Sequence, residues 1–467
     1  LDPACGTGGM LSVAEDYLRE HNPSARLHVY GQELNAETYA ICRSDMMLKG
    51  QDATNIAYSN SFSEDGHVGL QVDYAIANPP FGVEWKKVAD PIRDEAGSKG
   101  FAGRFGAGLP RINDGSFLFL QHMIAKMKPA EQGGSRVAIV FNGSPLFTGA
   151  AGSGESEIRR WIIENDWLEA VVALPDQLFY NTGISTYFWV VTNRKRPERR
   201  GKVQLVAARA MWTKMRKSLG EKRKQIADAQ IDDIVLAYGD FTDTDHPSGV
   251  RVKVFRNEAF GFLRITVERP LRVRWEVTDD TLAAVDADPK VAKLDDPTRA
   301  VLRDELEKWR GVTIADPGLA DKRVAALMGE AGVKGKPLRT AVLDALAVRD
   351  PDAQLVTDAK GNVLPDPDLR DNENVPLPPV LVTYEADPTA RLRTMEYRTA
   401  VDDYLEAEVH PYVPDAWVDH DKTKIGYEIP LTRHFYIYVP PRPLEEIDAE
   451  IKQLEAEIQE LLREVTE

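Results

Sequence analysis

The chain has 467 residues, of which 43% are hydrophobic and 28% charged, and its net charge is −16. This length allows two or three domains with a well-buried core, and the composition is ordinary for a soluble globular protein. No run of eighteen apolar residues occurs, so we expect no membrane span, and the acidic balance argues against a broad DNA-binding surface on this chain alone. The two cysteines, Cys5 and Cys42, and the scattered histidines indicate a reducing cytoplasm and no metal site.

The first motif is a glycine-rich turn ahead of a helical run at residues 10–19. It reads Asp2-Pro3-Ala4-Cys5-Gly6-Thr7-Gly8-Gly9. Glycines between a strand and a helix let a ligand approach the bare backbone, although many structural turns look alike. An acid beside the turn suits a cationic ligand better than a phosphate, which would favour helix amides without a nearby acid.

Glu33 ends the next predicted strand, which begins in the apolar run at residues 27–30. An acid at this point of a nucleotide-binding sheet can bond a ribose diol. The glycine turn also lacks the third glycine spacing of dinucleotide sites. S-adenosylmethionine, which carries a sulfonium and an ammonium but no phosphate, fits these two motifs.

Asn78-Pro79-Pro80-Phe81 directly follows a buried strand predicted at residues 72–77. The prolines stiffen the turn and remove two amide donors, which leaves the Asn78 side-chain oxygen and the Pro79 carbonyl as acceptors. These acceptors can bind both protons of an exocyclic amino group while Phe81 stacks on the base, so that the amine is aligned without a strong base. The alternative is that the tetrapeptide is simply a turn.

The first 200 residues alternate between strands and helices. Further apolar strands are predicted at 137–141, 170–174 and 186–192, and a helix by the spacing of Phe117, Leu120, Ile124 and Met127, capped by Asp114 or Ser116. Continuous apolar strands indicate burial on both faces. The sequence therefore predicts an α/β fold with a doubly wound, mostly parallel sheet and additional helical regions.

Four segments interrupt this pattern. Residues 97–115, with six glycines, and residues 149–154 are predicted lids or binding loops, or else disordered surface insertions. The basic stretches 193–202 and 214–224 could touch DNA phosphates, but a solvated loop is the simpler interpretation of either one alone.

Residues from about 270 to 385 are predicted to form an inserted or appended helical module, with a Pro- and Asp-rich stretch at 351–379 and a short hairpin near Gly361. In the last 25 residues an apolar stripe has the spacing of a coiled-coil helix: Ile447, Ile451, Leu454, Ile458, Leu461 and Val465. Under three heptads is too short for an isolated coiled coil, so the stripe needs a partner helix or its own domain to cover it.

Together the first motif, Gly31-Gln32-Glu33 and Asn78-Pro79-Pro80-Phe81 resemble the amino-methylating DNA methyltransferases, and most of all the methylation subunit of type I restriction-modification enzymes. Residues 143–147, 173–175 with Phe179, 182–184 and 426–433 also fit that subunit. The resemblance implies a Rossmann-like, S-adenosylmethionine-dependent methyltransferase that modifies adenine N6 in double-stranded DNA.

The resemblance also implies residue roles. Asp2, Gly6 and Gly8, with Pro3, Ala4 and Thr7 between them, would bind the cofactor's methionine side, and Glu33 its ribose. Asn60 and Phe62 lie where the family contacts adenine, although many relatives have Asp at the position of Asn60. Asn78, Pro79, Pro80 and Phe81 would handle the target base, which must leave the DNA stack to reach them.

The implied partners are a specificity subunit and a second methylation subunit, and whether a nuclease subunit joins stays open. We divide the chain into a catalytic domain at 1–200, a basic extension at 201–270, a helical insertion at 271–385 and a C-terminal region at 386–467, whose helix 443–467 would dock a subunit. Relatives carry a helical domain ahead of the glycine motif, so we expect this sequence to be a fragment with weakened or abolished cofactor binding.

Two other functions remain open. One is methyl transfer to another amino group, either cytosine N4 or a protein glutamine, since each needs the same acceptors. The other is a truncated, non-catalytic subunit that keeps the fold. The intact residues 78–81 argue against loss of activity, whereas the truncation argues for it.

Overall fold

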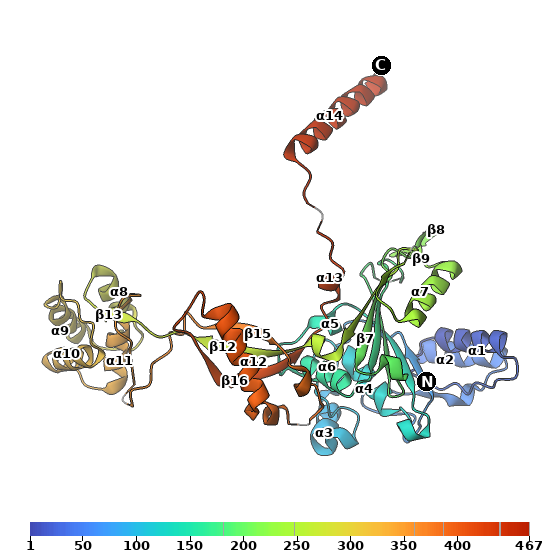
Figure 1. The fold of residues 1–467 in the computed structure, drawn as a ribbon, viewed down its shortest axis with the longest axis horizontal. Helices are drawn as coiled ribbons and strands as arrows, with labels where there is room; N and C mark the ends of the chain where they lie inside the picture. Colours follow the sequence, from blue (N-terminus) through green and yellow to red (C-terminus); the bar gives the residue numbers. More distant parts are fainter. Residues whose placement is uncertain (181, 247, 359, 386, 439, 467) are drawn as a thin grey trace.

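The computed structural model describes residues 1–466 except 181, 247, 359, 386 and 439, and leaves the side chains of 460 and 464–466 undescribed. Figure 1 shows a large α/β sheet on the right, a small antiparallel sheet in the middle and a helical lobe on the left. The C-terminal helix projects away from all three. None of the described helices is both long enough and apolar enough to cross a bilayer.

The central sheet contains seven described strands. In spatial order these are β10 (Thr244–Asp245), β11 (Arg251–Arg256), β7 (Lys202–Ala207), β5 (Leu168–Ala173), β6 (Tyr187–Thr192), β4 (Arg136–Phe141) and β3 (Tyr74–Ala77). The pairs β3–β4 and β5–β7 are parallel, whereas β6 lies antiparallel between β4 and β5. Strands β3, β4, β5 and β7 therefore point the same way, and β6 points back.

A second, two-stranded parallel sheet continues this arrangement beyond β3. It consists of β1 (Gly31–Glu33) and β2 (Ile56–Tyr58). Leu1 and Asp2 lie between β1 and β3: Asp2 donates to the Tyr30 carbonyl (3.0 Å), and the Leu1 carbonyl accepts from Ile76 (2.9 Å). The predicted mostly parallel sheet is confirmed, and the carboxyl ends of its parallel strands share one edge.

Helices cover both faces of the sheet, as a doubly wound fold requires. Every residue of β5 is buried, with Val171 in one core and Val172 in another on the opposite face. The first core includes α4 (Ser116–Ala125) and α6 (Gly154–Glu164), and the second includes α7 (Asp228–Asp240). Helices α1 (Gly9–His21) and α2 (Ala36–Leu48) form a further core with β2 and with Val29, which precedes β1.

The middle of the chain forms a lobe with a hydrophobic core of its own, between Val273 and Val356. Its elements are β13 (Val273–Trp275), α8 (Asp279–Ala287), α9 (Asp296–Glu307), α10 (Pro317–Glu330), α11 (Lys336–Ala345) and β14 (Ala347–Arg349). A bridge between Thr357 and Val363 forms the hairpin predicted near Gly361.

An antiparallel sheet separates this lobe from the central sheet in Figure 1. Its order is β15 (Asp371–Pro376), β12 (Gly261–Glu268) and β16 (Trp417–Tyr427). The remaining elements are α3 (Ala89–Lys99), α5 (Ser144–Phe147), β8 (Thr213–Leu219), β9 (Lys222–Gln225), α12 (Met395–Tyr404), α13 (Leu431–His434) and α14 (Leu444–Thr466).

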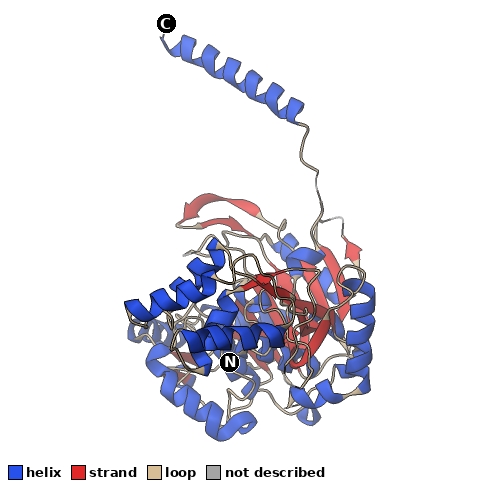
Figure 2. Cartoon of the chain, turned by 90° about the vertical axis from the view of Figure 1, so that its left-hand side faces the viewer, coloured by secondary structure: helices blue, strands red, loops and turns tan. Residues whose placement is uncertain are grey.

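Helix α14 stands apart from the rest of the molecule in both views (Figures 1 and 2). The stripe residues Leu454, Ile458 and Leu461 are 50%, 56% and 61% exposed. The side chain of Val465 lies outside the described residues. The alternative in which this helix packs on its own domain does not fit these exposures, and no described helix pairs with it as a coiled coil.

Candidate active site

All the predicted site segments leave the same edge of the parallel strands. Residues 3–9 follow Asp2, Glu33 ends β1, Asn60 and Phe62 follow β2, and Asn78 follows β3. Leu1 is hydrogen-bonded to β3, and neighbouring strands lie about 5 Å apart. The glycine turn and the turn at Asn78 are therefore adjacent, which the predicted chemistry requires.

The glycine turn is held against Glu33. The Gly6 amide donates to Glu33 Oε2 (2.8 Å), and the Asn35 amide donates to Oε1 (2.7 Å). Each carboxylate oxygen keeps a lone pair that could accept a ribose hydroxyl. Gly8 has φ +81°, and a Cβ there would fall 2.7 Å from Cys42 Sγ, so this position requires glycine.

Asp2 is only 2% exposed, and its Oδ1 accepts from the Ala4 amide (3.0 Å). Burial raises the pKa of Asp2 to about 7, against the opposing effect of the Ala4 hydrogen bond. A carboxylate that is costly to ionise in the ligand-free protein gains most from a cationic ligand. Asp2, Glu33 and the open backbone at Gly6 therefore fit the predicted cofactor.

The turn after β2 is tied to the glycine motif. Ser61 Oγ donates to the Pro3 carbonyl (2.5 Å), and Asn60 Oδ1 accepts from the Phe62 amide (2.9 Å). The Phe62 ring is 4% exposed and packs on Phe119, with 4.4 Å between ring centroids. Phe62 thus belongs to the core in this structure, and its contact with adenine remains a prediction.

Asn78 is exposed at the end of β3, whereas Pro79 beside it is buried. Within the described part of the chain, the Asn78 side chain makes no hydrogen bond. The buried proline fixes the turn, and the amide oxygen remains free to accept a proton from a ligand. Pro80 is exposed and Phe81 is half-buried.

Phe179 is not among the site residues predicted from the sequence, but the structure brings it against Phe81. It lies on the loop between β5 and β6, and its ring meets that of Phe81 edge-on, at 6.3 Å and 88°. Its sequence context had indicated only a likeness to one subfamily. The contact depends on two turns meeting at one sheet edge, which no local pattern reveals.

The glycine-rich segments are packed, so a disordered insertion is the wrong interpretation of them. Phe105 is 1% exposed, and a Cβ on Gly154 would overlap the Leu109 carbonyl. The Gly115 amide donates to the Val83 carbonyl (2.8 Å), two residues beyond Phe81. The first segment therefore braces the turn at residues 78–81.

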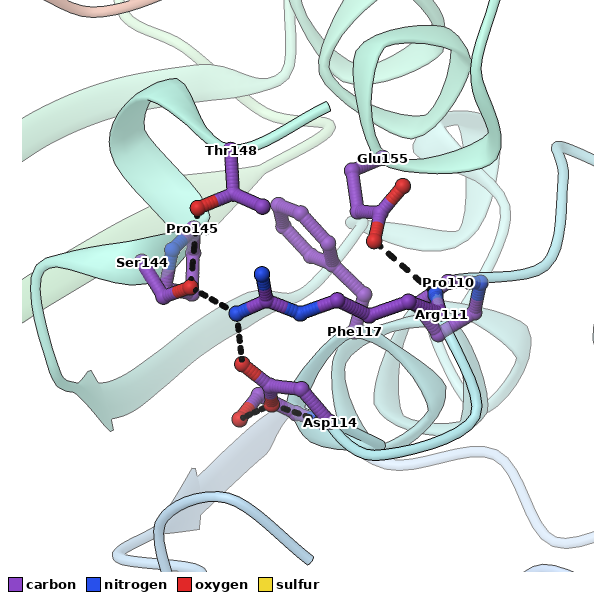
Figure 3. A pocket seen from close by; sticks show the side chains of 9 residues that line it. Pro110, Arg111, Asp114, Phe117, Ser144, Pro145, Thr148 and Glu155 are labelled. Carbon is purple, nitrogen blue, oxygen red and sulfur yellow. Dashed lines mark hydrogen bonds and ion pairs between the residues drawn. The ribbon is translucent and has the colours of Figure 1, made fainter. Parts of the chain in front are cut away.

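A small cavity lies beside this edge, near the carboxyl end of β4 (Figure 3). Arg111 crosses it: Nη2 donates to Ser144 Oγ (2.6 Å) and pairs with Asp114 (3.4 Å), and its amide donates to Glu155 (2.8 Å). Since none of the predicted site residues line this cavity, we interpret the arrangement as further bracing. The N-cap of α4 is Gly115, without a side-chain cap, so the predicted cap at Asp114 or Ser116 is wrong, although Asp114 Oδ1 accepts from the Ser116 amide (3.2 Å).

A parallel sheet whose edge gathers a glycine turn, an acid and an Asn-Pro-Pro-Phe turn has the architecture of the S-adenosylmethionine-dependent methyltransferases. Residues 1–255 match the N-6 DNA methylase family model. The chain belongs to this family.

Individual relatives agree with this assignment. The methylase subunit of type I restriction enzyme HindI from Haemophilus influenzae is 32% identical over 211 residues, which are 44% of this chain and 44% of that protein. The MjaIX methylase subunit of Methanocaldococcus jannaschii is 30% identical over 241 residues, 50% of this chain and 40% of its own length. The chain thus spans under half the length of these relatives.

Among solved structures, the methyltransferase subunit of a type I restriction-modification system from Streptococcus thermophilus is 26% identical, with a TM-score of 0.45. That match covers 55% of this chain and 50% of the other.

Proposed function

We propose that this chain transfers a methyl group from S-adenosylmethionine to N6 of adenine in double-stranded DNA, as the modification subunit of a type I restriction-modification system. The observation that carries the proposal is the free side-chain amide of Asn78 on a proline-fixed turn, adjacent to the glycine turn. The family assignment of residues 1–255 supports it.

The residues at the sheet edge divide the work. The Asn78 side-chain oxygen and the Pro79 carbonyl accept the two protons of the adenine amino group, which directs its lone pair toward the methyl donor. Phe81, backed by Phe179, stacks on the extruded base. As the new nitrogen–carbon bond forms, the sulfur–methyl bond of the donor would break to leave a neutral thioether, and the methylated nitrogen would then lose one proton to solvent. Because the acceptors carry no net charge, alignment of the amine replaces a strong base.

The remaining predicted residues hold the cofactor, whose sulfonium methyl group is the group transferred. Asp2 would hold its cationic methionine portion together with the backbone from Pro3 to Gly8. Glu33 would bond the ribose hydroxyls, and Asn60 and Phe62 would contact the adenine ring. Asp2 and Glu33 thereby orient the donor relative to Asn78.

We further propose that a specificity subunit supplies the base recognition, with a second methylation subunit in the assembly and a nuclease subunit as an additional partner. The exposed apolar stripe of α14, within residues 443–467, would dock the specificity subunit. We also propose that the domain boundaries lie near residues 200, 270 and 385. We place the protein in the cytoplasm, where its free thiols stay reduced.

The test is labelled methyl transfer by the chain assembled with its specificity subunit. After digestion of the DNA to nucleosides, we expect the label in N6-methyladenine. Asn78→Ala should lower the rate about a hundredfold or more, because a transition-state hydrogen bond is lost, while binding of S-adenosylmethionine is unchanged. Asn22→Ala is the matched control, since Asn22 is an exposed asparagine at the far end of α1.

Label on cytosine or only on protein would contradict the adenine assignment. Absence of transfer would contradict the proposed activity of this chain, and full activity of Asn78→Ala would remove the proposed role of Asn78.

A further inference from the structure

The two basic stretches of the sequence lie at opposite edges of the central sheet. Residues 193–202 follow β6, which is antiparallel to its neighbours, so they lie at the edge remote from Asn78. The second stretch, residues 214–224, lies in the segment after β7, which is parallel to β5, so it lies at the edge that carries Asn78. Only the second stretch can reach DNA bound at the candidate active site.

Two cations of the first stretch, Lys195 and Arg199, are buried in the fold. Lys195 is 6% exposed and donates to Asp166 (2.6 Å) and to the Lys202 carbonyl (2.8 Å). Arg199 is 5% exposed and donates to Gln204 Oε1 (3.0 Å). These two cations hold neighbouring segments together, so they are neither the DNA contact nor the solvated loop considered from the sequence.

The second stretch forms the hairpin β8–β9, which projects above α7 in Figure 1. It carries six cations against the single acid Glu221. Four of them are exposed and form no ion pair with any described residue: Lys214, Arg216, Lys217 and Arg223. Lys214 lies directly opposite Lys224, whose charge is paired with Asp176. The four exposed cations, and not a repulsion within the hairpin, are what an anionic ligand could pair with.

The hairpin is fixed to the loop that carries Phe179. The Arg223 amide donates to the Gln177 carbonyl (3.0 Å), and the Glu221 amide donates to the Tyr180 carbonyl (3.1 Å). Lys222 lies 5.1 Å from the Tyr180 ring centroid. Because Phe179 contacts Phe81, the exposed cations are held beside the turn that would receive the target base.

We propose that the hairpin β8–β9 binds the backbone phosphates of the DNA strand that flank the extruded base. This inference rests on the proposed function. It adds the surface through which this acidic chain binds the phosphate backbone of its DNA substrate. The hairpin backbone fixes where the cations lie, and their free side chains pair with phosphate without reading sequence.

The test is the salt dependence of binding to a random-sequence DNA duplex, measured with the full chain by fluorescence anisotropy between about 50 and 200 mM salt. We expect Arg216→Gln, Lys217→Gln and Arg223→Gln together to reduce the slope of log affinity against log salt by about three, one for each phosphate that the variant no longer neutralises. The matched control removes three exposed cations at the other edge: Arg196→Gln, Arg200→Gln and Lys202→Gln. Its slope should equal that of the native chain.

Equal slopes for the hairpin variant and the native chain would overturn the inference, as would equal reductions of slope in hairpin and control variants or no binding at all by the native chain. If the triple variant no longer melts cooperatively, the single variant Lys217→Gln replaces it in the test. We expect Lys217→Gln to reduce the slope of log affinity against log salt by about one. Because binding is measured without methyl transfer, a chain that binds through the hairpin but methylates nothing would contradict only the proposed function.

Discussion

At the scale of single residues, the ionised carboxylate of Asp2 lowers the stability of the fold but favours binding of a cationic ligand. Its carboxyl group is buried, and burial raises its pKa from 3.8 to about 7. A carboxyl group whose pKa is higher in the folded state than in the unfolded state stabilises the fold fully when the pH is below its unfolded-state pKa. This contribution to the free energy of unfolding is lost as the pH rises to the folded-state pKa. The chain therefore loses stability from this group between about pH 4 and 7, a cost that a cationic ligand offsets.

The expected result is a pH-dependent affinity for S-adenosylmethionine. The ionised fraction of a group with a pKa of about 7 rises about tenfold between pH 6 and 8, so affinity should rise by up to the same factor. Asp2→Asn should bind more weakly and without this dependence, and above pH 7 it should melt at a higher temperature than the native chain. Calorimetric titration and thermal melting measure both effects; an affinity independent of pH in the native chain would contradict the role of Asp2.

At the scale of elements, the sequence predicted the features that lie within a single strand and the turn that follows it. The glycine turn, Glu33 and residues 78–81 each belong to one strand and its following turn, and chain periodicity reveals such units. The meeting of Phe81 with Phe179 and the reversed direction of β6 depend on strand order, which periodicity does not encode. For the same reason the sequence could not decide which basic stretch lies beside the site.

Helix α14 presents its stripe without a covering element, so we expect it to contribute to assembly and not to the stability of the isolated chain. Leu454→Ser with Ile458→Ser should weaken binding of the specificity subunit about a hundredfold or more, because burial of each side chain contributes about 1.5–3 kcal/mol. The melting temperature of the chain alone should not change, since these side chains are 50% and 56% exposed.

The control is Glu455→Ser with Gln459→Ser, on a different face of the same helix. If both pairs weaken binding equally, or neither does, the stripe is not the docking surface. Surface plasmon resonance with the immobilised specificity subunit gives the affinities.

At the scale of the whole molecule, the chain contains two large cores that share no buried residue. One spans the central and middle sheets, and the other fills the helical lobe. We expect two calorimetric transitions, each sensitive to its own core. Leu306→Ala should destabilise only the lobe and Leu118→Ala only the sheet core, each by about 2–5 kcal/mol, because both leucines are 0% exposed. A single transition that both variants shift together would show that the cores unfold as one unit.

Because β6 runs opposite to its neighbours, the basic residues 193–202 lie away from the candidate active site and the hairpin β8–β9 lies beside it. This placement affects the orientation in which the molecule can approach DNA. The net charge of −16 repels DNA, whereas the hairpin β8–β9 presents four exposed cations beside the candidate active site. At about 0.01 M salt charges act over about 30 Å, so a duplex feels the repulsion of the whole molecule; at about 0.15 M the range is about 8 Å, and the hairpin acts nearly alone. At physiological ionic strength, salt therefore screens the repulsion between DNA and the distant acidic surface. The attraction between DNA phosphates and the hairpin cations acts at short range and favours encounters in which the hairpin faces the DNA.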